Sequence, residues 1–308
     1  MKVCIIGAGT VGLYTGWKLA QKNHKVEIFE KKKEIKNEAC SGMFSEKIFK
    51  FIPESRSLIE REINYALLHF PKKTIKIKYS QNFYLINHSK LDKLLAKECL
   101  KNKVKITLGK EITKLPQNYD RIIGCDGYNS FTRNFLKLPS PKFRLGILGF
   151  SNTPWKENYV ETWPCKNGFI WKIPRGKNTE YGIMAGITEA KKLLENFLKE
   201  RKIKISNIQA KIIPQGFIVP KNEKITLLGD ATGLTKPWSG GGVIWGLTSA
   251  DILLKTFPDF ILFQKKMENF FLPRLLFSKT ATKLAYFLGF NFPWIIPSCV
   301  KIESDFLV

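Results

Sequence analysis

The chain opens with a short apolar run that meets glycines and then continues with apolar residues at helical spacing. Residues 3–6 predict a buried strand, residues 10–21 a helix and residues 26–30 a second strand. This order is typical of a βαβ unit, in which the two strands are parallel. The pattern returns late in the chain, where a buried strand over 225–229 precedes a glycine-rich loop and a helix over 241–255. Two distant segments therefore predict one α/β domain.

Strand-like runs fill most of the chain between those segments. They cover residues 65–70, 74–79, 83–87, 104–108, 121–125, 143–150, 159–163, 169–173 and 181–187. A helix over 90–102, with Ser89 as its N-cap, interrupts them, and Ser130 begins a short amphipathic turn. A helix through Arg201 and another pair of strands up to Val219 follow. The block from 143 to 219 is typical of a mostly antiparallel sheet.

These patterns predict an α/β fold in which an inserted, mostly antiparallel sheet domain interrupts a Rossmann-like domain and a C-terminal helical cap follows. The Rossmann-like domain comprises residues 1–62, 87–140 and 221–257, the sheet domain residues 63–86 and 141–220, and the C-terminal helical segment residues 258–308. The sequence has no apolar run of about 18 residues, so we expect no membrane-spanning helix. The aromatic stretch 285–297 fits either a helix packed on the core or a segment lying at a membrane interface.

A glycine fingerprint, GAGTVG, occupies residues 7–12 between the first strand and the first helix. In this context Gly7 permits a tight turn, Gly9 lets a pyrophosphate approach the backbone, and Gly12 allows the helix to pack closely on the sheet. Glu30 ends the second strand, where a carboxylate accepts hydrogen bonds from an adenosine ribose. The carboxylate disfavours a 2′-phosphate, so the fingerprint predicts binding of FAD or NAD.

The charge and the cysteine content of the chain indicate which partners and which cellular compartment to expect. Lys and Arg number 51 against 26 Asp and Glu, which gives a net charge of +25 spread along the chain. Such a surface attracts anions, and nucleic acid, an anionic membrane and phosphate-bearing small molecules all fit. The six cysteines form no CxxC pair and have no histidine at ligand spacing, so neither a metal site nor a disulfide framework is predicted. We therefore expect a reducing, cytoplasmic setting.

Two further motifs follow the glycine fingerprint. Asp126 and Gly127 begin DGYNSFTR, and Gly229 and Asp230 begin a segment that continues to Pro237 and to Gly240, Gly241 and Gly242. In order and placement they resemble the DGxxSxxR and GDAxxxxxPxxGGG motifs of flavoproteins with the p-hydroxybenzoate hydroxylase fold. The resemblance implies FAD as the cofactor, so that the Rossmann-like domain is an FAD-binding domain. It also implies that Asp230 binds the ribityl chain, that Asp126 holds the loop near the pyrophosphate, and that loop 237–242 faces the flavin ring.

Two more segments resemble those of the geranylgeranyl reductase family. EACSGM at residues 38–43 contains Cys40, and Phe169, Trp171 and Pro174 lie in a segment similar to the family's YxWxFP motif. The resemblance implies an FAD-dependent reductase of prenyl double bonds, in membrane lipid biosynthesis, with a prenylated lipid as substrate. It also implies an external electron donor, NAD(P)H or ferredoxin. The basic surface and the aromatic stretch fit a peripheral protein at the inner face of an anionic membrane.

Reduction of an isolated double bond needs a hydride and a proton. Cys40 is the candidate proton donor, because a thiol in an apolar pocket stays protonated; it also fits as a small packing residue. Phe169, Trp171 and Pro174 are the candidate wall of an apolar substrate tunnel, although aromatic residues on a strand also occur as plain core. The family usually has an arginine four residues before the position of Asp92, and this sequence has His88 there.

Other functions remain open at this point. The same fold hosts FAD-dependent monooxygenases and halogenases, and a halogenase needs a specific lysine, for which Lys72 and Lys73 are present without supporting context. A basic nucleic-acid-binding flavoprotein is a further alternative. We expect no nucleic-acid partner, because no recognised nucleic-acid motif is present.

Overall fold

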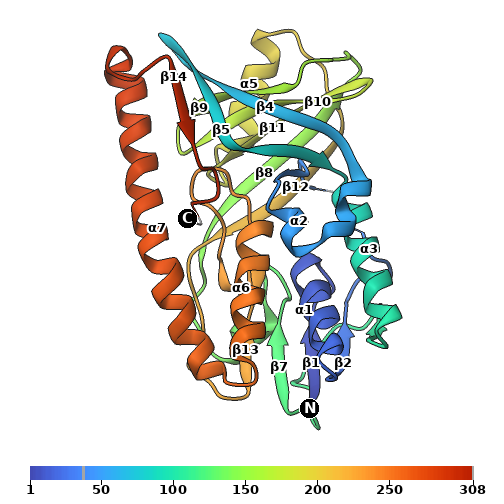
Figure 1. Cartoon of the computed structure of the whole chain (residues 1–308). Helices are drawn as coiled ribbons and strands as arrows, with labels where there is room; N and C mark the ends of the chain where they lie inside the picture. Colours follow the sequence, from blue (N-terminus) through green and yellow to red (C-terminus); the bar gives the residue numbers. More distant parts are fainter. Residues whose placement is uncertain (37–38, 307–308) are drawn as a thin grey trace.

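The computed structural model describes residues 1–36 and 39–306, which form two sheets (Figure 1). The first sheet has five parallel strands in the order β13-β7-β1-β2-β6. Its strands are β1 (Lys2–Ile6), β2 (Lys25–Phe29), β6 (Lys105–Thr107), β7 (Arg121–Gly124) and β13 (Ile225–Leu227). Strands from both ends of the chain share this sheet, so the predicted α/β fold with a discontinuous Rossmann-like sheet is confirmed.

Three helices cover one face of that sheet. They are α1 (Thr10–Gln21), α3 (His88–Lys101) and α6 (Val243–Thr256), and α1 contacts both of the others. Helix α1 has the predicted bounds, and its apolar residues are buried together with those of α3 and α6 in the largest core cluster. Helix α3 starts earlier than predicted, because Asn87 and not Ser89 is its N-cap: the Asn87 side chain accepts a hydrogen bond from the Lys90 amide.

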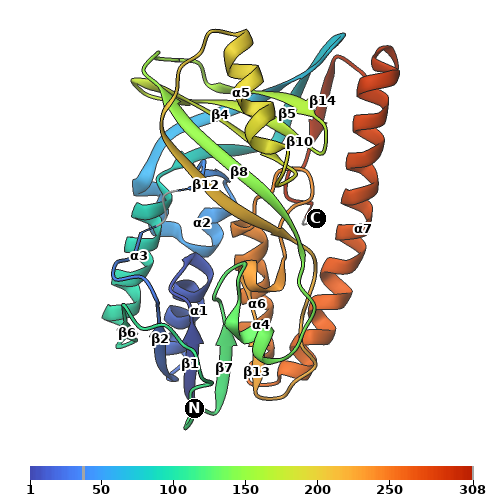
Figure 2. The same ribbon diagram turned by 180° about the vertical axis from the view of Figure 1, so that it is seen from behind.

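The second sheet has nine strands and curves over the first (Figures 1 and 2). Its main order is β12-β8-β11-β10-β9-β4-β5-β14, and β3 pairs with β5. The strands are β3 (Met43–Ser45), β4 (Ile59–Phe70), β5 (Lys73–Ile86), β8 (Lys142–Ser151), β9 (Tyr159–Cys165), β10 (Gly168–Arg175), β11 (Asn178–Ala185), β12 (Ser206–Gln215) and β14 (Cys299–Ile302). Most pairs are antiparallel, as predicted, but β4 with β9 and β5 with β14 are parallel.

Two parts of this sheet differ from the sequence prediction. The pair of strands expected before Val219 is a single strand, β12, which pairs with β8. The C-terminal segment, predicted to be helical, also contains β14, which adds an edge strand beside β5. Its four residues show only weak alternation, so tertiary pairing rather than local pattern decides the structure there.

A long helix, α7 (Phe260–Asn291), runs along one side of the molecule and spans the height of both sheets (Figure 1). Pro273 lies within it. No helix in the described part of the chain is long and apolar enough to cross a membrane. The remaining short elements are α2 (Ile48–Phe51), η1 (Pro53–Leu58), α4 (Phe131–Phe135), α5 (Ala190–Glu200), η2 (Gly229–Thr232) and η3 (Pro293–Ile295).

Candidate cofactor and substrate site

A cavity of about 1060 Å³ lies between the carboxyl ends of the parallel strands and the inner face of the second sheet. In an open α/β sheet this edge is where ligands bind. The glycine turn after β1, the end of β2, the loop around Cys40 and the loops after β7 and β13 all line the cavity. All the predicted cofactor-binding residues line it except Pro237, whose carbonyl lies 3.4 Å from the Gln215 amide nitrogen.

The glycine turn has the geometry that the fingerprint predicts. Gly7 has φ +107°, and a Cβ there would lie 2.2 Å from the Cys125 carbonyl oxygen. A Cβ on Gly12 would lie 2.1 Å from the Gly7 carbonyl oxygen. By contrast, a Cβ on Gly9 would meet nothing within 4 Å, although Gly9 lines the cavity. Gly7 and Gly12 are therefore required by the protein itself, whereas Gly9 leaves space for a ligand.

Glu30 follows β2 and turns its carboxylate to the same end of the cavity. One oxygen accepts a hydrogen bond from the Ala8 amide at 2.8 Å, and the other accepts one from the Lys32 amide at 2.9 Å. These bonds fix the carboxylate beside the glycine turn, in the position expected for a group that binds ribose hydroxyls.

The two later motifs are joined by a buried arginine. Arg133, the last residue of the first motif, donates hydrogen bonds to the carbonyls of Tyr128 and Ala231, and so connects the loop after β7 with the loop after β13. Asp126 accepts two hydrogen bonds from Thr132 through Oδ2. Its Oδ1 is buried and has no hydrogen-bond partner among the described residues, so this edge of the cavity has an unused acceptor.

The loop from Lys236 to Gly242 closes the other end of the cavity. The Gly240 amide donates to the Lys236 carbonyl at 2.8 Å, and the Lys236 amide donates to the Gly241 carbonyl at 3.1 Å. Gly240 has φ +69°, and a Cβ there would lie 2.4 Å from the Met184 sulfur. These glycines let the backbone approach the neighbouring strands, and helix α6 begins directly after them.

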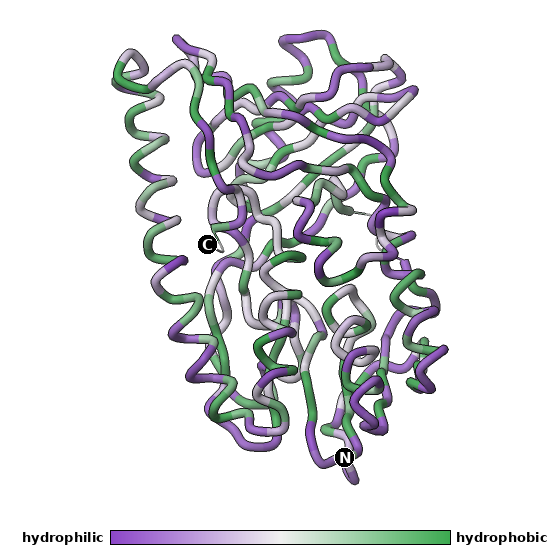
Figure 3. The backbone as a smooth tube through the Cα atoms, viewed as in Figure 1, coloured by the Kyte–Doolittle hydropathy of each residue, from purple (hydrophilic) through white to green (hydrophobic). Residues whose placement is uncertain are grey.

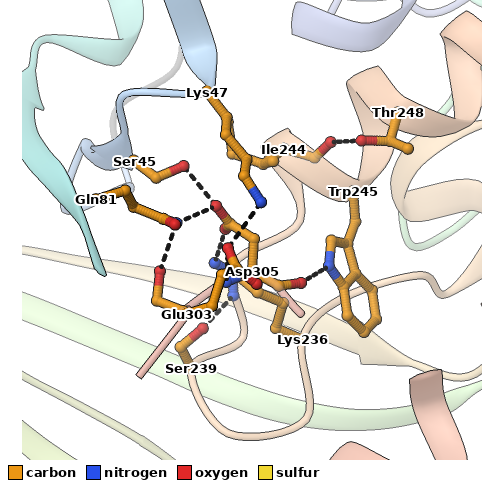
Figure 4. Close-up of polar contacts among 12 residues, drawn as sticks. Ser45, Lys47, Gln81, Lys236, Ser239, Ile244, Trp245, Thr248, Glu303 and Asp305 are labelled. Carbon is orange, nitrogen blue, oxygen red and sulfur yellow. Dashed lines mark hydrogen bonds and ion pairs between the residues drawn. The ribbon is translucent and has the colours of Figure 1, made fainter. Parts of the chain in front are cut away.

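A buried ion pair anchors this loop to the end of the chain (Figure 4). Lys236 Nζ lies 2.8 Å from Asp305 Oδ1, and Asp305 is fully buried. Its Oδ2 accepts hydrogen bonds from Ser45 at 2.5 Å and from Gln81 at 2.9 Å, while its carbonyl accepts one from the Trp245 indole at 2.7 Å. The segment after β14 therefore ties the loop to the second sheet and to α6.

Comparisons with known proteins agree with this geometry. A family model described as an NAD(P)-binding Rossmann-like domain matches residues 5–35, which contain the glycine turn and Glu30. A digeranylgeranylglycerophospholipid reductase of Methanococcus vannielii is 25% identical over 78% of this chain and 72% of its own length. The chain is therefore a sequence homologue of this reductase.

Solved structures place the fold among flavoproteins. A geranylgeranyl bacteriochlorophyll reductase-like protein of Thermoplasma acidophilum is 18% identical with a TM-score of 0.80, and the match covers 94% of this chain and 87% of that one. PqsL of Pseudomonas aeruginosa, described as a probable FAD-dependent monooxygenase, is 15% identical with a TM-score of 0.70, covering 94% and 95% of the two chains. The flavin-dependent halogenase CmlS and the halogenase PltM share the fold as well. These likenesses show the fold, and they agree with the predicted FAD cofactor and with the predicted enzyme class, an FAD-dependent oxidoreductase.

The residues of this reductase homologue fit FAD. The open space at Gly9 and the N-terminal amides of α1 suit a pyrophosphate, the Glu30 carboxylate suits a ribose, and Asp126 lines the same cavity. The backbone of the glycine loop at 240–242, before the N-terminus of α6, suits the flavin ring, on which negative charge develops when it is reduced.

Cys40 lines the cavity, but its surroundings differ from the expected apolar pocket. The thiol has a hydrogen-bonding contact with His88, at the start of α3, and accepts a further one from the Gly42 amide at 3.4 Å. The expectation of an apolar setting for this thiol is therefore wrong. Glu38, at the start of the same motif, lies outside the described residues.

Of the three predicted substrate residues, Trp171 lines the cavity, whereas Phe169 and Pro174 lie outside its lining. The Trp171 indole donates to Glu180 at 2.8 Å. Glu180 is fully buried and also pairs with Arg175 at 2.6 Å, and Arg175 in turn donates to the Ser41 carbonyl. One buried carboxylate thus fixes both the tryptophan and the loop that carries Cys40.

Sequence reasoning missed three charged residues at this site: Glu180, Lys236 and Lys211. Lys211, on β12, lines the cavity and lies 3.3 Å from Asp230. The carboxylate of Asp230 raises the pKa of Lys211 although burial opposes this, so the lysine stays charged. In the sequence, Lys211 is a single lysine within the apolar run 210–213. The alternation of a strand does not show whether such a lysine faces a cavity or the solvent.

Proposed function

We propose that the chain is an FAD-dependent reductase that saturates double bonds of geranylgeranyl-type prenyl chains, in the biosynthesis of membrane lipids. One observation carries the proposal: a single cavity joins a dinucleotide cradle to an apolar wall, with a thiol and an imidazole between them. The likeness to the digeranylgeranylglycerophospholipid reductase supports the same substrate class.

The apolar wall comes from the second sheet, from β3, β8, β10, β11 and β12. Its lining residues are Met43, Phe44, Leu148, Trp171, Met184 and Ile213. A prenyl chain offers only apolar surface, so its affinity comes from burial, at about 25 cal/mol per Å². FAD, when bound and reduced, supplies a hydride. The protein's own task is to hold the chain against this wall, to exclude water and to supply a proton to the second carbon.

A monooxygenase or halogenase is the second candidate, because enzymes of both kinds share the fold. The lysines considered for a halogenase, Lys72 and Lys73, lie outside the cavity lining, and Lys73 donates a hydrogen bond to the Ile296 carbonyl. The position of these two lysines therefore favours the reductase.

Product mass separates the candidates. The FAD-loaded protein is reduced with dithionite under argon in D₂O and given a digeranylgeranyl phospholipid. We expect a product that gains two deuterium atoms per double bond, because dithionite supplies only electrons and both added hydrogens come from the solvent. Substrate that returns unchanged under argon but gains oxygen when air is admitted would contradict the reductase and support the monooxygenase.

We further propose that the protein is cytoplasmic and takes this lipid from the inner face of an anionic membrane. The C-terminal half of α7 and the following η3 expose several large apolar side chains. In Figure 3 the backbone of this helix is green at its recurring hydrophobic positions. They are Leu276, Phe277, Leu284, Phe287, Trp294 and Ile295, each at least 55% exposed. Tyr286, on the same helix, donates a hydrogen bond to the Gly168 carbonyl at 3.0 Å, so this surface adjoins the start of β10.

Charge favours a lipid surface as the partner. Residues 269–302 contain no acidic residue, and Lys279 and Lys283 are exposed among the aromatic side chains. Basic residues near an anionic membrane each contribute about 1 kcal/mol, and exposed Trp and Phe side chains insert at the headgroup level. Together these features support a segment that lies on the membrane without crossing it.

Vesicle sedimentation tests this surface. The double variant Phe287→Ser/Trp294→Ser should lose most binding to phosphatidylglycerol vesicles. Its matched control is Leu100→Ser/Phe135→Ser, which removes two other exposed apolar side chains, on α3 and α4, and should bind as the parent does. Equal binding by the two double variants, or equal binding of the parent to neutral phosphatidylcholine vesicles, would contradict the proposal.

We propose that electrons come from an external donor, NAD(P)H or ferredoxin. The one glycine fingerprint found in the sequence lies where FAD would bind, so a nicotinamide donor would bind transiently. Anaerobic reduction of the bound FAD by NADH, NADPH or reduced ferredoxin distinguishes the donors, and reduction by none of the three would contradict this part of the proposal.

A further inference from the structure

A buried polar cluster joins the start of α3 to the glycine turn and to the loop around Cys40. Thr10, His88 and Asp92 are each at most 7% exposed. The Thr10 hydroxyl donates a hydrogen bond to Asp92 Oδ1 at 2.5 Å and lies 2.7 Å from His88 Nε2. Because that hydroxyl proton is committed to Asp92, the hydroxyl accepts a hydrogen bond from His88, which therefore carries a proton on Nε2.

The charges in this cluster act on Cys40. Burial opposes ionisation of the thiol, but the charge of His88, its hydrogen bond and the Gly42 amide together lower the pKa of Cys40. Burial also opposes the charged form of His88, yet Cys40 and Asp92 raise the pKa of His88 to about 8. Burial raises the pKa of Asp92 in spite of His88 and Thr10. Lys211, from β12, and Lys32, after β2, are the other charged groups that act on the cluster.

Four other cysteines lack such a partner in their surroundings. Burial raises the pKa of each of them: Cys4, Cys99, Cys125 and Cys165. Cys40 differs because a histidine lies beside it, and both residues line the cavity that holds the proposed substrate wall. The family usually has arginine at the position of His88. The histidine in this chain therefore gives the Cys40 thiol a partner that can exchange a proton with it.

We propose that Cys40 and His88 form a thiolate–imidazolium pair, oriented by Thr10 and Asp92, and that this pair supplies the proton for the reduction. The inference rests on the proposed function. When one carbon of the double bond accepts the hydride that reduced FAD provides, the other carbon takes a proton from the Cys40 sulfur, to which His88 has passed it. A C–H bond forms as the S–H bond breaks, His88 is left neutral, and it regains its proton from water. The double bond gains one hydride and one proton in total.

Thiol alkylation tests the pair without any catalytic turnover. In a Cys299→Ser background, which removes an exposed cysteine, the rate at which iodoacetamide modifies Cys40 is followed by peptide mass spectrometry over roughly pH 5 to 10, with and without FAD. We expect half-maximal alkylation at a pH below that of an ordinary thiol. His88→Asn should move this midpoint upward and slow alkylation at pH 7 by about tenfold, because the thiolate fraction falls. The matched control, His69→Asn, alters a histidine on β4 and should change neither.

If alkylation of Cys40 has the same midpoint pH in His88→Asn and in the parent, the proposed thiolate–imidazolium pair is refuted. If the cavity hinders iodoacetamide, the ultraviolet difference spectrum between the parent and Cys40→Ser reports the thiolate directly, and it must titrate at a higher pH in His88→Asn. The proton-donor role has its own test: Cys40→Ser that retains FAD and reduces prenyl chains at the parental rate would refute it. A parent that shows the alkylation profile but reduces no prenyl lipid would refute the proposed function and leave the pair intact.

Discussion

Asp305→Asn isolates the ion pair that anchors the glycine loop to the second sheet. Asn has nearly the same shape as Asp and still offers a side-chain oxygen to Ser45 and Gln81, so packing and most hydrogen bonds are retained. What disappears is the negative charge 2.8 Å from Lys236, a lysine that is 8% exposed. The variant therefore leaves a buried ammonium group without its counter-charge.

The size of the effect follows from burial. Removing one partner of a buried pair costs about 3–5 kcal/mol, because the remaining charge stays desolvated. Replacing both partners by uncharged groups avoids that penalty, so Lys236→Met/Asp305→Asn should recover a large part of the loss. Burial alone would raise the pKa of Asp305, but Lys236 and the Ser45 hydrogen bond lower it overall. The stabilisation is thus present at neutral pH and disappears as the pH falls below about 4, where the carboxylate takes up a proton.

Urea unfolding at pH 7, followed by tryptophan fluorescence, measures the free energy of unfolding of the two variants. The fluorescence includes the signal of Trp245, which donates to the Asp305 carbonyl. We expect Asp305→Asn to lower the free energy of unfolding by about 3 kcal/mol or more and to weaken FAD binding, since the loop loses its anchor. A loss below about 1 kcal/mol, or a double variant no more stable than Asp305→Asn, would refute the reasoning.

Three further substitutions probe the cradle and the apolar wall. Gly9→Val should leave the free energy of unfolding within about 1 kcal/mol of the parent, because φ is −78° and a Cβ meets nothing, yet abolish FAD binding; a variant that retains flavin absorbance would contradict the cradle. Gly182→Ala should cost about 1–3 kcal/mol in urea unfolding, since the added Cβ would lie 2.3 Å from the Trp171 ring, and an unchanged unfolding curve would count against this packing. Glu180→Gln should destabilise by about 3 kcal/mol because Arg175 loses a buried partner, and calorimetry that finds no change would show the pair to be unimportant.

The parts of the fold that the sequence predicts are those fixed by local chemistry. Helix α1 begins and ends where its glycine turn and apolar spacing place it, and Ser130 caps α4 by accepting a hydrogen bond from the Arg133 amide. The glycine motifs identify the cavity edge because each needs a backbone approach that a Cβ would block, as at Gly7.

The parts of the fold and of the site that the sequence does not predict depend on contacts between distant segments. Strand β14 pairs with an edge that β5 offers, and Asp305, which pairs with Lys236, follows that strand closely in the chain. Likewise, the chemistry of Cys40 depends on His88, 48 positions away in the sequence, and no local pattern relates the two. Burial and pairing of this kind follow from register and packing, which a single sequence specifies only indirectly.

Anaerobic reoxidation of the flavin tests the central claim most directly. The FAD-loaded protein is reduced with one equivalent of dithionite in the absence of oxygen, mixed with a digeranylgeranyl phospholipid, and followed by the flavin absorbance. The account predicts that the oxidised spectrum returns without oxygen, with two electrons consumed for every double bond lost from the lipid. A flavin that stays reduced in the presence of the lipid and is reoxidised only when oxygen is admitted would contradict it.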